Sequence, residues 1–496
     1  MGIMYESTRN SKERVTASQA VLKGLAPDGG LYVPERIPVL DKTLEEFSDM
    51  DYRQTAYEVM KLFLTDYTET ELKNCINAAY DNKFDTEEIC ELRKADDAYF
   101  LELFHGRTLA FKDMALSILP HLLTAAAKKN DMKEKIVILT ATSGDTGKAA
   151  LAGFADVPGT KIIVFYPKSG VSKVQEKQMV TQKGKNTSVI GIHGNFDDAQ
   201  SGVKMMFSDK ELEKELKSEG YVFSSANSIN IGRLVPQIVY YVYSYAKLVK
   251  KGVIKAGDKI NVVVPTGNFG NILAAYYAKC ASLPIDKLIC ASNDNKVLYD
   301  FFNTGVYDKN REFILTTSPS MDILISSNLE RLIYELTGRN SEKTAALMEN
   351  LKTAGRYELS PEMKDKLKDF AGGFASTEEV SLQIKKVYES DSYIIDTHTA
   401  VASAVCDSYR KKSGDSKPVI IASTASPYKF MGSVLTSIDK KYEGMDDFTL
   451  ADELSKLSET SVPQAIIDLK TAPVLHKNVC DKDEMKKMVL NVLGIN

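Results

Sequence analysis

The sequence has few cysteines, and none of them form a closely spaced pair. Its six cysteines stand far apart along 496 residues, at Cys75, Cys90, Cys280, Cys290, Cys406 and Cys480. Without a C-x-x-C pair, the sequence indicates neither a zinc site nor a disulfide framework, and it fits a reducing compartment. The five histidines lack H-x-x-x-H spacing, so we expect no metal site.

An excess of positive charge and a long apolar run are also missing. The 63 Lys and Arg residues are interspersed with 67 Asp and Glu residues, for a formal net charge of -4. This balance gives no electrostatic footprint for nucleic acid. The most apolar stretch, 234–249, is interrupted by Gln237, Ser244 and Lys247, whereas a membrane helix needs roughly 18 uninterrupted apolar residues. Since the first residues carry no apolar signal core, we expect a cytoplasmic protein without nucleic-acid or membrane partners.

The length of 496 residues predicts two or three domains. Residues 1–95 have helix-like apolar spacing and predict a mainly helical N-terminal domain. We assign 96–225 to a smaller α/β domain and 226–496 to a larger one. Within the larger domain, the charged, helix-prone stretch from about 325 to 390 predicts a helical insertion, with Gly372-Gly373 as a hinge-like break.

Short, continuous apolar runs alternate with helical segments from about residue 130 onward. The predicted strands are 135–140, 161–166, 188–192, 261–265, 287–291 and 418–422. Continuous apolar strands between helices are typical of parallel sheets that are covered on both faces. The sequence therefore predicts an α/β fold with two open, mostly parallel sheets covered by helices. We also predict a helix from Lys112 to about Lys129, kinked at Pro120.

Lys112 stands at the junction of a glycine-containing turn and an apolar helix. Its neighbours include Phe111, Met114, Leu116 and Ile118. Apolar surroundings disfavour the charged form of a lysine, and a neutral amine can form a Schiff base with an aldehyde cofactor. The alternative is an ordinary lysine whose stem packs on the protein while its ammonium reaches water.

Polar loops follow three of the predicted strands. Thr142–Gly147 opens a helix, where exposed amides suit a carboxylate or a phosphate. It does not fit the phosphate loop of nucleotide triphosphatases, because Thr142 stands where that pattern needs Gly and Ala149 where it needs Ser or Thr. The alternative is a plain strand-to-helix turn with a hydroxyl cap.

The second and third polar loops are Gly267–Asn271 and 422–427. The glycines of the former let backbone amides approach an anion closely, so a bound phosphate fits there. It lacks the G-x-G-x-x-G spacing of a dinucleotide site. The latter presents hydroxyls at the same edge of the sheet. Together with Lys112, three polar loops at strand ends indicate a ligand site.

The segment 224–233 concentrates side-chain donors, among them Asn227, ahead of Arg233. Arg233 could bind an anionic substrate through two parallel hydrogen bonds. It could equally be a structural arginine behind a polar helix cap, and both interpretations stay open. We interpret 172–177, which contains Lys177, as the solvated start of a helix.

Four motifs in this order resemble threonine synthases. They are His105–Asp113, Leu139–Gly147, Asn227–Asn230 and Pro265–Asn271. The resemblance runs from the Gly-Leu-Ala-Pro-Asp-Gly-Gly-Leu segment at 24–31 to 427–430 and so covers most of the chain. The family belongs to the fold type II enzymes that use pyridoxal 5'-phosphate (PLP), and this sequence is similar to its longer form with an N-terminal helical domain.

The resemblance implies roles for particular residues. Lys112 would be the catalytic Schiff-base lysine, and Thr424 would face the pyridine nitrogen of the cofactor. The cradle of the cofactor phosphate would be Gly267, Asn268, Phe269, Gly270 and Asn271. The substrate carboxylate would bind to the loop of Ser143, Gly144, Asp145, Thr146 and Gly147, and we also assign Asn227 and Arg233 to substrate binding.

The implied reaction converts O-phospho-L-homoserine and water into L-threonine and phosphate, by γ-elimination followed by β-addition of water. We expect a monomer or homodimer. One alternative is a related fold type II lyase or dehydratase that acts on another hydroxy or phospho amino acid. Another is a non-catalytic α/β protein that binds a nucleotide or phosphate, but such a protein has no reason to place Lys112 in an apolar setting.

The chain departs from the family at Arg107, where threonine synthases usually have Pro. Either the loop tolerates this exchange, or Arg107 helps to hold the substrate phosphate. Lys148, Lys177 and Arg233 are the other candidate ligands for that phosphate.

Overall fold

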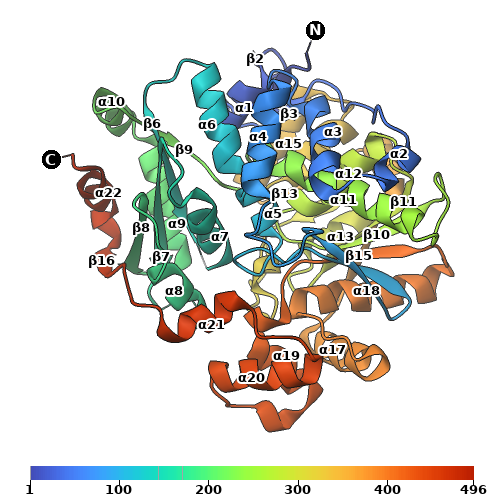
Figure 1. The fold of residues 1–496 in the computed structure, drawn as a ribbon. Helices are drawn as coiled ribbons and strands as arrows, with labels where there is room; N and C mark the ends of the chain where they lie inside the picture. The colour runs from blue at the N-terminus through green and yellow to red at the C-terminus, as the bar shows by residue number, and fades with distance from the viewer. Residues whose placement is uncertain (1, 143, 170, 172, 496) are drawn as a thin grey trace.

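The computed structural model describes residues 2–142, 144–169, 171 and 173–495. Within these residues, a six-stranded sheet and a five-stranded sheet are flanked by helices, and two small antiparallel sheets stand apart from them. Figure 1 shows the smaller of the two main sheets in green at one side of the molecule, with the larger one opposite. This arrangement confirms the predicted α/β class with two mostly parallel sheets.

The larger sheet has parallel pairs throughout, except for β4 and β5 at one edge. In spatial order it consists of β14 (Phe370–Phe374), β11 (Ile285–Ser292), β10 (Ile260–Pro265), β15 (Val419–Ser423), β5 (Ala98–Glu102) and β4 (Glu91–Ala95). All residues of β10 and β15 are buried, as expected for central strands that helices cover on both faces.

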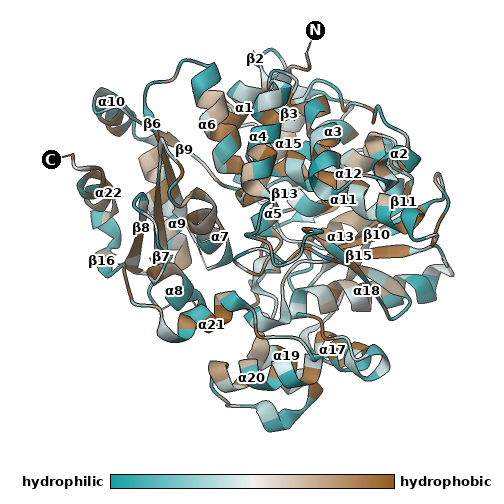
Figure 2. Cartoon of the chain, viewed as in Figure 1, coloured by the Kyte–Doolittle hydropathy of each residue, from teal (hydrophilic) through white to brown (hydrophobic). Residues whose placement is uncertain are grey.

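The smaller sheet is parallel throughout. Its order is β16 (Asn478–Asp481), β8 (Thr187–His193), β7 (Thr160–Pro167), β6 (Lys135–Ala141) and β9 (Tyr221–Ser224). Its helices are α7 (Asp145–Phe154), α8 (Lys173–Val180), α9 (Phe196–Ser208), α10 (Lys210–Ser218) and α22 (Met485–Leu493). In Figure 2 the hydrophobic residues concentrate on the strands, while α10 at the outside is largely hydrophilic.

The N-terminal part is mainly helical and packs on α11 (Ile231–Lys250), a long and almost fully buried helix. Its helices are α1 (Ala17–Lys23), α2 (Leu44–Ser48), α3 (Tyr52–Phe63) and α4 (Glu69–Ala79), and its strands are β1 (Tyr5–Ser7), β2 (Arg14–Val15) and β3 (Tyr32–Pro34). Helix α3 illustrates why these residues fold this way: Asp51 and Gln54 form a capping box at its start. Its apolar residues recur at helical spacing, so that one face is buried.

The remaining elements cover the larger sheet or connect the two. They are α5 (Lys112–Leu116), α6 (Leu119–Lys129), α12 (Gly270–Cys280), α13 (Val297–Thr304), β12 (Val306–Asp308), α14 (Leu329–Leu336), α15 (Ser341–Thr353), β13 (Arg356–Glu358), α16 (Pro361–Asp365), α17 (Thr377–Asp391), α18 (Thr397–Ser413), α19 (Met431–Ile438), α20 (Asp447–Ser458) and α21 (Gln464–Thr471). In the described part of the chain, no helix is both long and apolar enough to cross a membrane.

The predicted helix from Lys112 to Lys129 is in fact two helices, α5 and α6, that are separated at Ser117 and Ile118. Pro120 lies in the first turn of α6. An N–H group in that position has no helical partner, so proline marks a helix start here rather than a kink.

Gly372-Gly373 is not a hinge-like break within an insertion. Both residues belong to β14, which pairs in parallel with β11 at the edge of the larger sheet. A Cβ atom on Gly373 would lie 2.4 Å from Cγ1 of Val405 in α18. The glycine therefore allows α18 to pack closely on the strand, a tertiary reason that the local sequence does not reveal.

Two strands belong to the other sheet than the assigned domains imply. Strand β5 lies within 96–225 but belongs to the larger sheet, and β16 lies within 226–496 but pairs with β8 of the smaller sheet. Figure 1 shows the red C-terminal segment running to β16 and α22 beside that sheet. The assignment of 226–496 to the larger domain thus needs correction for its last residues, because a short edge strand carries little apolar signal. The boundary at about residue 95 stays a prediction.

Candidate active site

Hydrogen bonds join the loop before Lys112 to the end of β15. The amide of Phe111 donates to the carbonyl of Thr424 over 2.8 Å, and the amide of Ser426 donates to the carbonyl of Leu109 over 3.0 Å. Leu109 has a φ of 58°, a left-handed conformation that few residues other than glycine adopt. This bonding brings the predicted cofactor residues Lys112 and Thr424 together.

The side chain of Lys112 is 12% exposed. Its Nζ lies 3.6 Å from Oδ2 of Asp145 and donates to Oγ of Ser320 over 3.2 Å. Burial lowers the pKa of Lys112 below the ordinary lysine value, although the carboxylate of Asp145 opposes this shift. The structure thus places this amine where burial disfavours its charged form, as the apolar sequence around it predicts.

Asp145 lies between two lysines. Nζ of Lys429, whose side chain is 3% exposed, lies 2.8 Å from Oδ1 of Asp145. It also donates to the carbonyl of Thr108 over 2.9 Å. Burial opposes ionisation of Asp145, but the ammonium groups of Lys429 and Lys112 outweigh it, so the pKa of this carboxyl falls below its ordinary value. Since the side chain is an anion, only the backbone of Asp145 is suited to meet a substrate carboxylate.

Some backbone amides of the loop between β6 and α7 form hydrogen bonds within the loop. Oγ1 of Thr142 accepts hydrogen bonds from the amides of Gly144 and Gly147 over 3.0 and 2.9 Å. Ser143, a predicted substrate residue, lies outside the described residues. Asp145 and Thr146 occupy the first turn of α7, where amides have no partner within the helix and attract anions.

The loop Gly267–Asn271 connects β10 to α12. Phe269 adopts the left-handed conformation with φ 63° immediately before the helix. A Cβ on Gly267 would lie 2.5 Å from the carbonyl oxygen of Ser320, so only glycine fits there. Oδ1 of Asn271 accepts a hydrogen bond from the hydroxyl of Tyr241.

Nδ2 of Asn271 is buried and has no hydrogen-bond partner among the residues that the structure describes. A buried donor without a partner costs roughly 1–3 kcal/mol. The side chain is therefore arranged for an acceptor that a bound ligand would supply. This observation fits the predicted phosphate cradle of PLP.

Arg233 in the first turn of α11 also carries a buried donor without a described partner, its Nε. Its Nη1 donates to the carbonyl of Ala226 over 2.8 Å, and burial lowers the pKa of Arg233 to about 10. The structural interpretation is supported by the hydrogen bond of Nη1, and the anion-binding interpretation is supported by the free Nε. Asn227, nearby in the preceding loop, is exposed.

Ser320, which no sequence pattern marks as a site residue, lies between Lys112 and a buried histidine. Its Oγ donates to Oδ2 of Asp145 over 3.3 Å, and its amide donates to Nε2 of His398 over 3.2 Å. Nδ1 of His398 lies 2.8 Å from Oδ2 of Asp396. Because Nε2 accepts from a backbone amide, the ring proton is on Nδ1 and faces Asp396. Asp396 caps α18, but no local pattern connects that cap to Lys112.

The other candidate cations for the substrate phosphate lie elsewhere. Nζ of Lys177 donates to the carbonyl of Lys470 over 3.5 Å and lies 5.5 Å from the ring centroid of Phe448. Arg107 and Lys148 line a separate cavity. Among these four, Arg233 contributes to the lowered pKa of Lys112, after the larger effect of burial.

Three family models match the chain. They are "Threonine synthase N terminus" over residues 4–80, "Pyridoxal-phosphate dependent enzyme" over 91–424 and "Threonine synthase, C-terminal" over 399–479. The threonine synthase of Saccharomyces cerevisiae is 34% identical over 520 residues, which cover 98% of this chain and 99% of the yeast protein. The chain belongs to the threonine synthase family.

The solved structures agree with this membership. A PLP-bound threonine synthase from Brucella melitensis is 34% identical to this chain and superposes on it with a TM-score of 0.87, and the match covers 99% of each chain.

Threonine synthase-like 1 from Macaca fascicularis is 35% identical over 498 residues, and the chain spans 64% of that protein's length. The family, the fold type II architecture and the PLP cofactor predicted from the sequence are thereby confirmed, and the chain is a PLP-dependent enzyme.

Proposed function

We propose that this enzyme converts O-phospho-L-homoserine and water into L-threonine and phosphate, the last step of threonine biosynthesis. The observation that carries the proposal is the buried amine of Lys112, which lies beside Asp145 and Ser320. Buried donors without described partners, on Asn271 and Arg233, supply two further positions for anions. The substrate and the cofactor together carry two phosphates and a carboxylate.

In this proposal PLP is held by Lys112, by the loop Gly267–Asn271 and by Thr424. The loop precedes α12 and supplies helix-start amides and the free Nδ2 of Asn271 for the cofactor phosphate. A neutral hydroxyl from Thr424 would face the pyridine nitrogen and, unlike a carboxylate, would not favour a proton there. When bound, PLP acts as the electron sink for negative charge that develops next to the substrate amine.

Lys112 then performs the proton transfers. The substrate amine would displace Lys112 from PLP, and the freed Nζ would then take the proton from the α carbon of the substrate and act again at the β carbon, within one flexible side chain's reach. Asp145 stabilises the ammonium that this produces, because its carboxylate lies 3.6 Å from Nζ. Ser320 directs Nζ through its hydroxyl, which both accepts from Lys112 and donates to Asp145.

The substrate's two anionic groups would bind at two different positions. The amides at the start of α7 are suited to the carboxylate. The free Nε of Arg233 is suited to the phosphate, with Asn227 in the loop that precedes α11. Arg233 has no carboxylate partner among the described residues, so a phosphate would neutralise a buried charge.

The direct test is the product analysis of the PLP-loaded protein with O-phospho-L-homoserine. We expect L-threonine and phosphate in equal amounts. Release of a 2-oxo acid and ammonia would instead identify a dehydratase of the same fold. No turnover at all, with PLP bound, would indicate another amino-acid substrate.

Ser320→Ala should lower kcat about tenfold, because it removes one hydrogen bond worth roughly 1.4 kcal/mol from the group that directs Lys112. KM for O-phospho-L-homoserine should change less than about twofold, since Ser320 positions the amine rather than the substrate. Steady-state kinetics check both numbers, with Ser218→Ala on the exposed face of α10 as the control. A rise in KM at constant kcat would assign Ser320 to substrate binding instead.

Arg107→Pro should keep at least half of the activity. The side chain of Arg107 is exposed, and no hydrogen bond or ion pair fixes it within the described residues. Proline requires only an ordinary φ, and Arg107 is not among the residues with positive φ. The check is kcat with PLP saturation confirmed by absorbance. A collapse of kcat with PLP still bound would place Arg107 at the substrate phosphate.

A further inference from the structure

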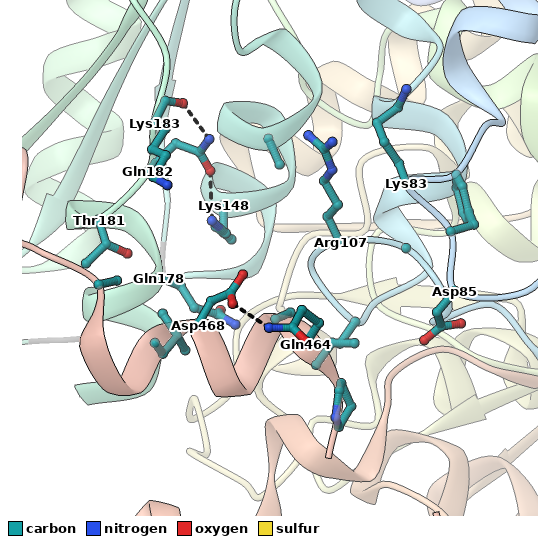
Figure 3. A pocket seen from close by; sticks show the side chains of 18 of the residues that line it. Lys83, Asp85, Arg107, Lys148, Gln178, Thr181, Gln182, Lys183, Gln464 and Asp468 are labelled. Atoms are coloured by element: carbon teal, nitrogen blue, oxygen red, sulfur yellow. Dashed lines mark hydrogen bonds between the residues drawn. The ribbon is translucent and has the colours of Figure 1, made fainter. Parts of the chain in front are cut away.

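A cavity of about 710 Å³ lies beside the candidate active site. Its walls come from the loop before Lys112, from α7, from the end of α8 and the residues after it, and from α21 of the C-terminal segment. Figure 3 shows Lys148 and Gln182 on one side, Arg107 on the other, and Gln464 and Asp468 of α21 below them. Its volume is typical of sites for small molecules.

The lining of this cavity carries more positive than negative charge. Its cations are Lys83, Arg107, Lys148 and Lys183, and its carboxylates are Asp85 and Asp468. Asp85 is bound to His105, with 2.6 Å between Oδ1 and Nδ1. Burial opposes protonation of His105, but Asp85 and Glu102 outweigh it and raise its pKa to about 9. The cavity is therefore locally positive in a chain whose formal net charge is -4.

Lys148 is half-buried, in contrast to the exposed Arg107 and Lys183. Its Nζ donates to Oε1 of Gln182 over 2.8 Å, and no carboxylate of the described residues forms an ion pair with it. Burial lowers the pKa of Lys148 to about 8; Asp113 opposes the shift, while Lys429 and Arg107 add to it. A buried ammonium with a neutral partner and a second cation nearby is stabilised by any anion that enters.

Arg107 and Lys183 reinforce this arrangement. Both are exposed, and neither side chain forms a hydrogen bond or ion pair with another described residue. Lys83 differs, because it is bound to Asp81 and to the carbonyl of Ala78. Three cations without an ion-pair partner among the described residues therefore line one cavity, and Gln178, Thr181 and Gln182 add neutral polar groups.

The cavity is separate from the candidate active site. Its lining does not include the active-site residues Lys112, Asp145, Ser320 and Arg233. It also includes no residue of the loop Gly267–Asn271. Lys148 and Asp145 lie on the same helix, α7, yet the carboxylate of Asp145 is bound to Lys429 and Lys112 instead. An anion in the cavity would thus leave the cofactor and substrate positions free.

We propose that this cavity is a second anion site, in which Lys148, Arg107 and Lys183 bind a tetrahedral phosphate group, either free or as a phosphomonoester. A phosphate accepts hydrogen bonds on all its oxygens, which suits several cations that converge from different elements. The volume leaves room for a small organic group beyond the phosphate. The proposal concerns binding and does not depend on which reaction the enzyme catalyses.

The test is calorimetric titration of the PLP-loaded protein with inorganic phosphate, and separately with glycerol phosphate as a phosphomonoester. We expect saturable binding that Lys148→Met and Arg107→Gln each weaken about tenfold or more, the loss of roughly one charge-assisted hydrogen bond. Lys177→Met is the matched control, because it removes a cation from α8 outside the cavity. Lys177→Met should bind each probe with the same affinity as the unsubstituted protein.

The comparison of the two probes identifies the source of the phosphate. Tighter binding of inorganic phosphate indicates the free ion, and tighter binding of glycerol phosphate indicates a monoester. Two results would overturn the proposal: no saturable binding of either probe, or binding that survives in Lys148→Met and Arg107→Gln but is lost in Arg233→Gln. The visible absorption of bound PLP shows that each variant is folded.

Discussion

Replacing Lys112 by alanine should lower kcat by at least about 10²–10⁴-fold, the usual contribution of one general acid–base group. It should also change the visible absorption of the PLP-loaded protein, because the amine that attaches the cofactor is removed. Lys112 is 12% exposed and its pKa is lowered by burial, so no other described residue combines this reactivity with this position. Steady-state kinetics and absorption spectra provide the check.

The matched control for this substitution is Lys128→Ala in the last turn of α6, where the lysine is exposed. Its kcat and spectrum should equal those of the unsubstituted protein. If Lys112→Ala kept its activity within about tenfold, another group would carry the proton transfers and the proposed mechanism would be incorrect.

Asp145→Asn should destabilise the fold by about 3–5 kcal/mol at neutral pH, the usual effect of removing one partner from a buried ion pair. The substitution leaves the 3% exposed side chain of Lys429 without its counter-charge. The same change should lower kcat, because Asp145 no longer stabilises the charged form of Lys112. Urea unfolding of the PLP-loaded protein measures the stability.

The destabilisation should depend on pH in a defined direction. The pKa of Asp145 in the folded chain lies below its ordinary value, near 3.9 in an unfolded chain. The carboxylate therefore contributes fully above about pH 5, and the contribution is lost as pH falls below about 4. The difference in the free energy of unfolding between Asp145→Asn and the unsubstituted protein should therefore become smaller as the pH falls below about 4. Glu453→Gln, which breaks an exposed pair with Lys456 on α20, should change neither stability nor its pH profile.

Strands and strand-end loops were predictable from the sequence because their signals are local. β10 and β15 are buried along their whole length, so their apolar runs are continuous. The rule that ligands bind at the carboxyl ends of parallel strands applies to the loops after β10 and β15, which are neighbours in the larger sheet. The loop after β6 belongs to the smaller sheet and is joined to the site by the ion pairs of Asp145 with Lys112 and Lys429. In the structure the loop after β15 indeed bonds to the segment before Lys112.

The rest of the site depends on contacts between distant segments. Ser320, His398 and Lys429 surround Lys112 and Asp145, but nothing in their own neighbourhoods marks them. The glycines of β14 are explained only by the close packing of α18. For Asp145, the sequence predicts a place in the strand-end loop. Its ion pair with Lys429 cannot be predicted locally, because the tertiary fold brings the two residues together.

We propose that PLP is attached to Lys112, and peptide mapping identifies the lysine that carries it. The PLP-loaded protein would be reduced with borohydride, digested and analysed by mass spectrometry. We expect a stable PLP-derived mass on Lys112 and on no other lysine. The modification of a different lysine, or the absence of any stable adduct from a protein that binds PLP, would contradict it.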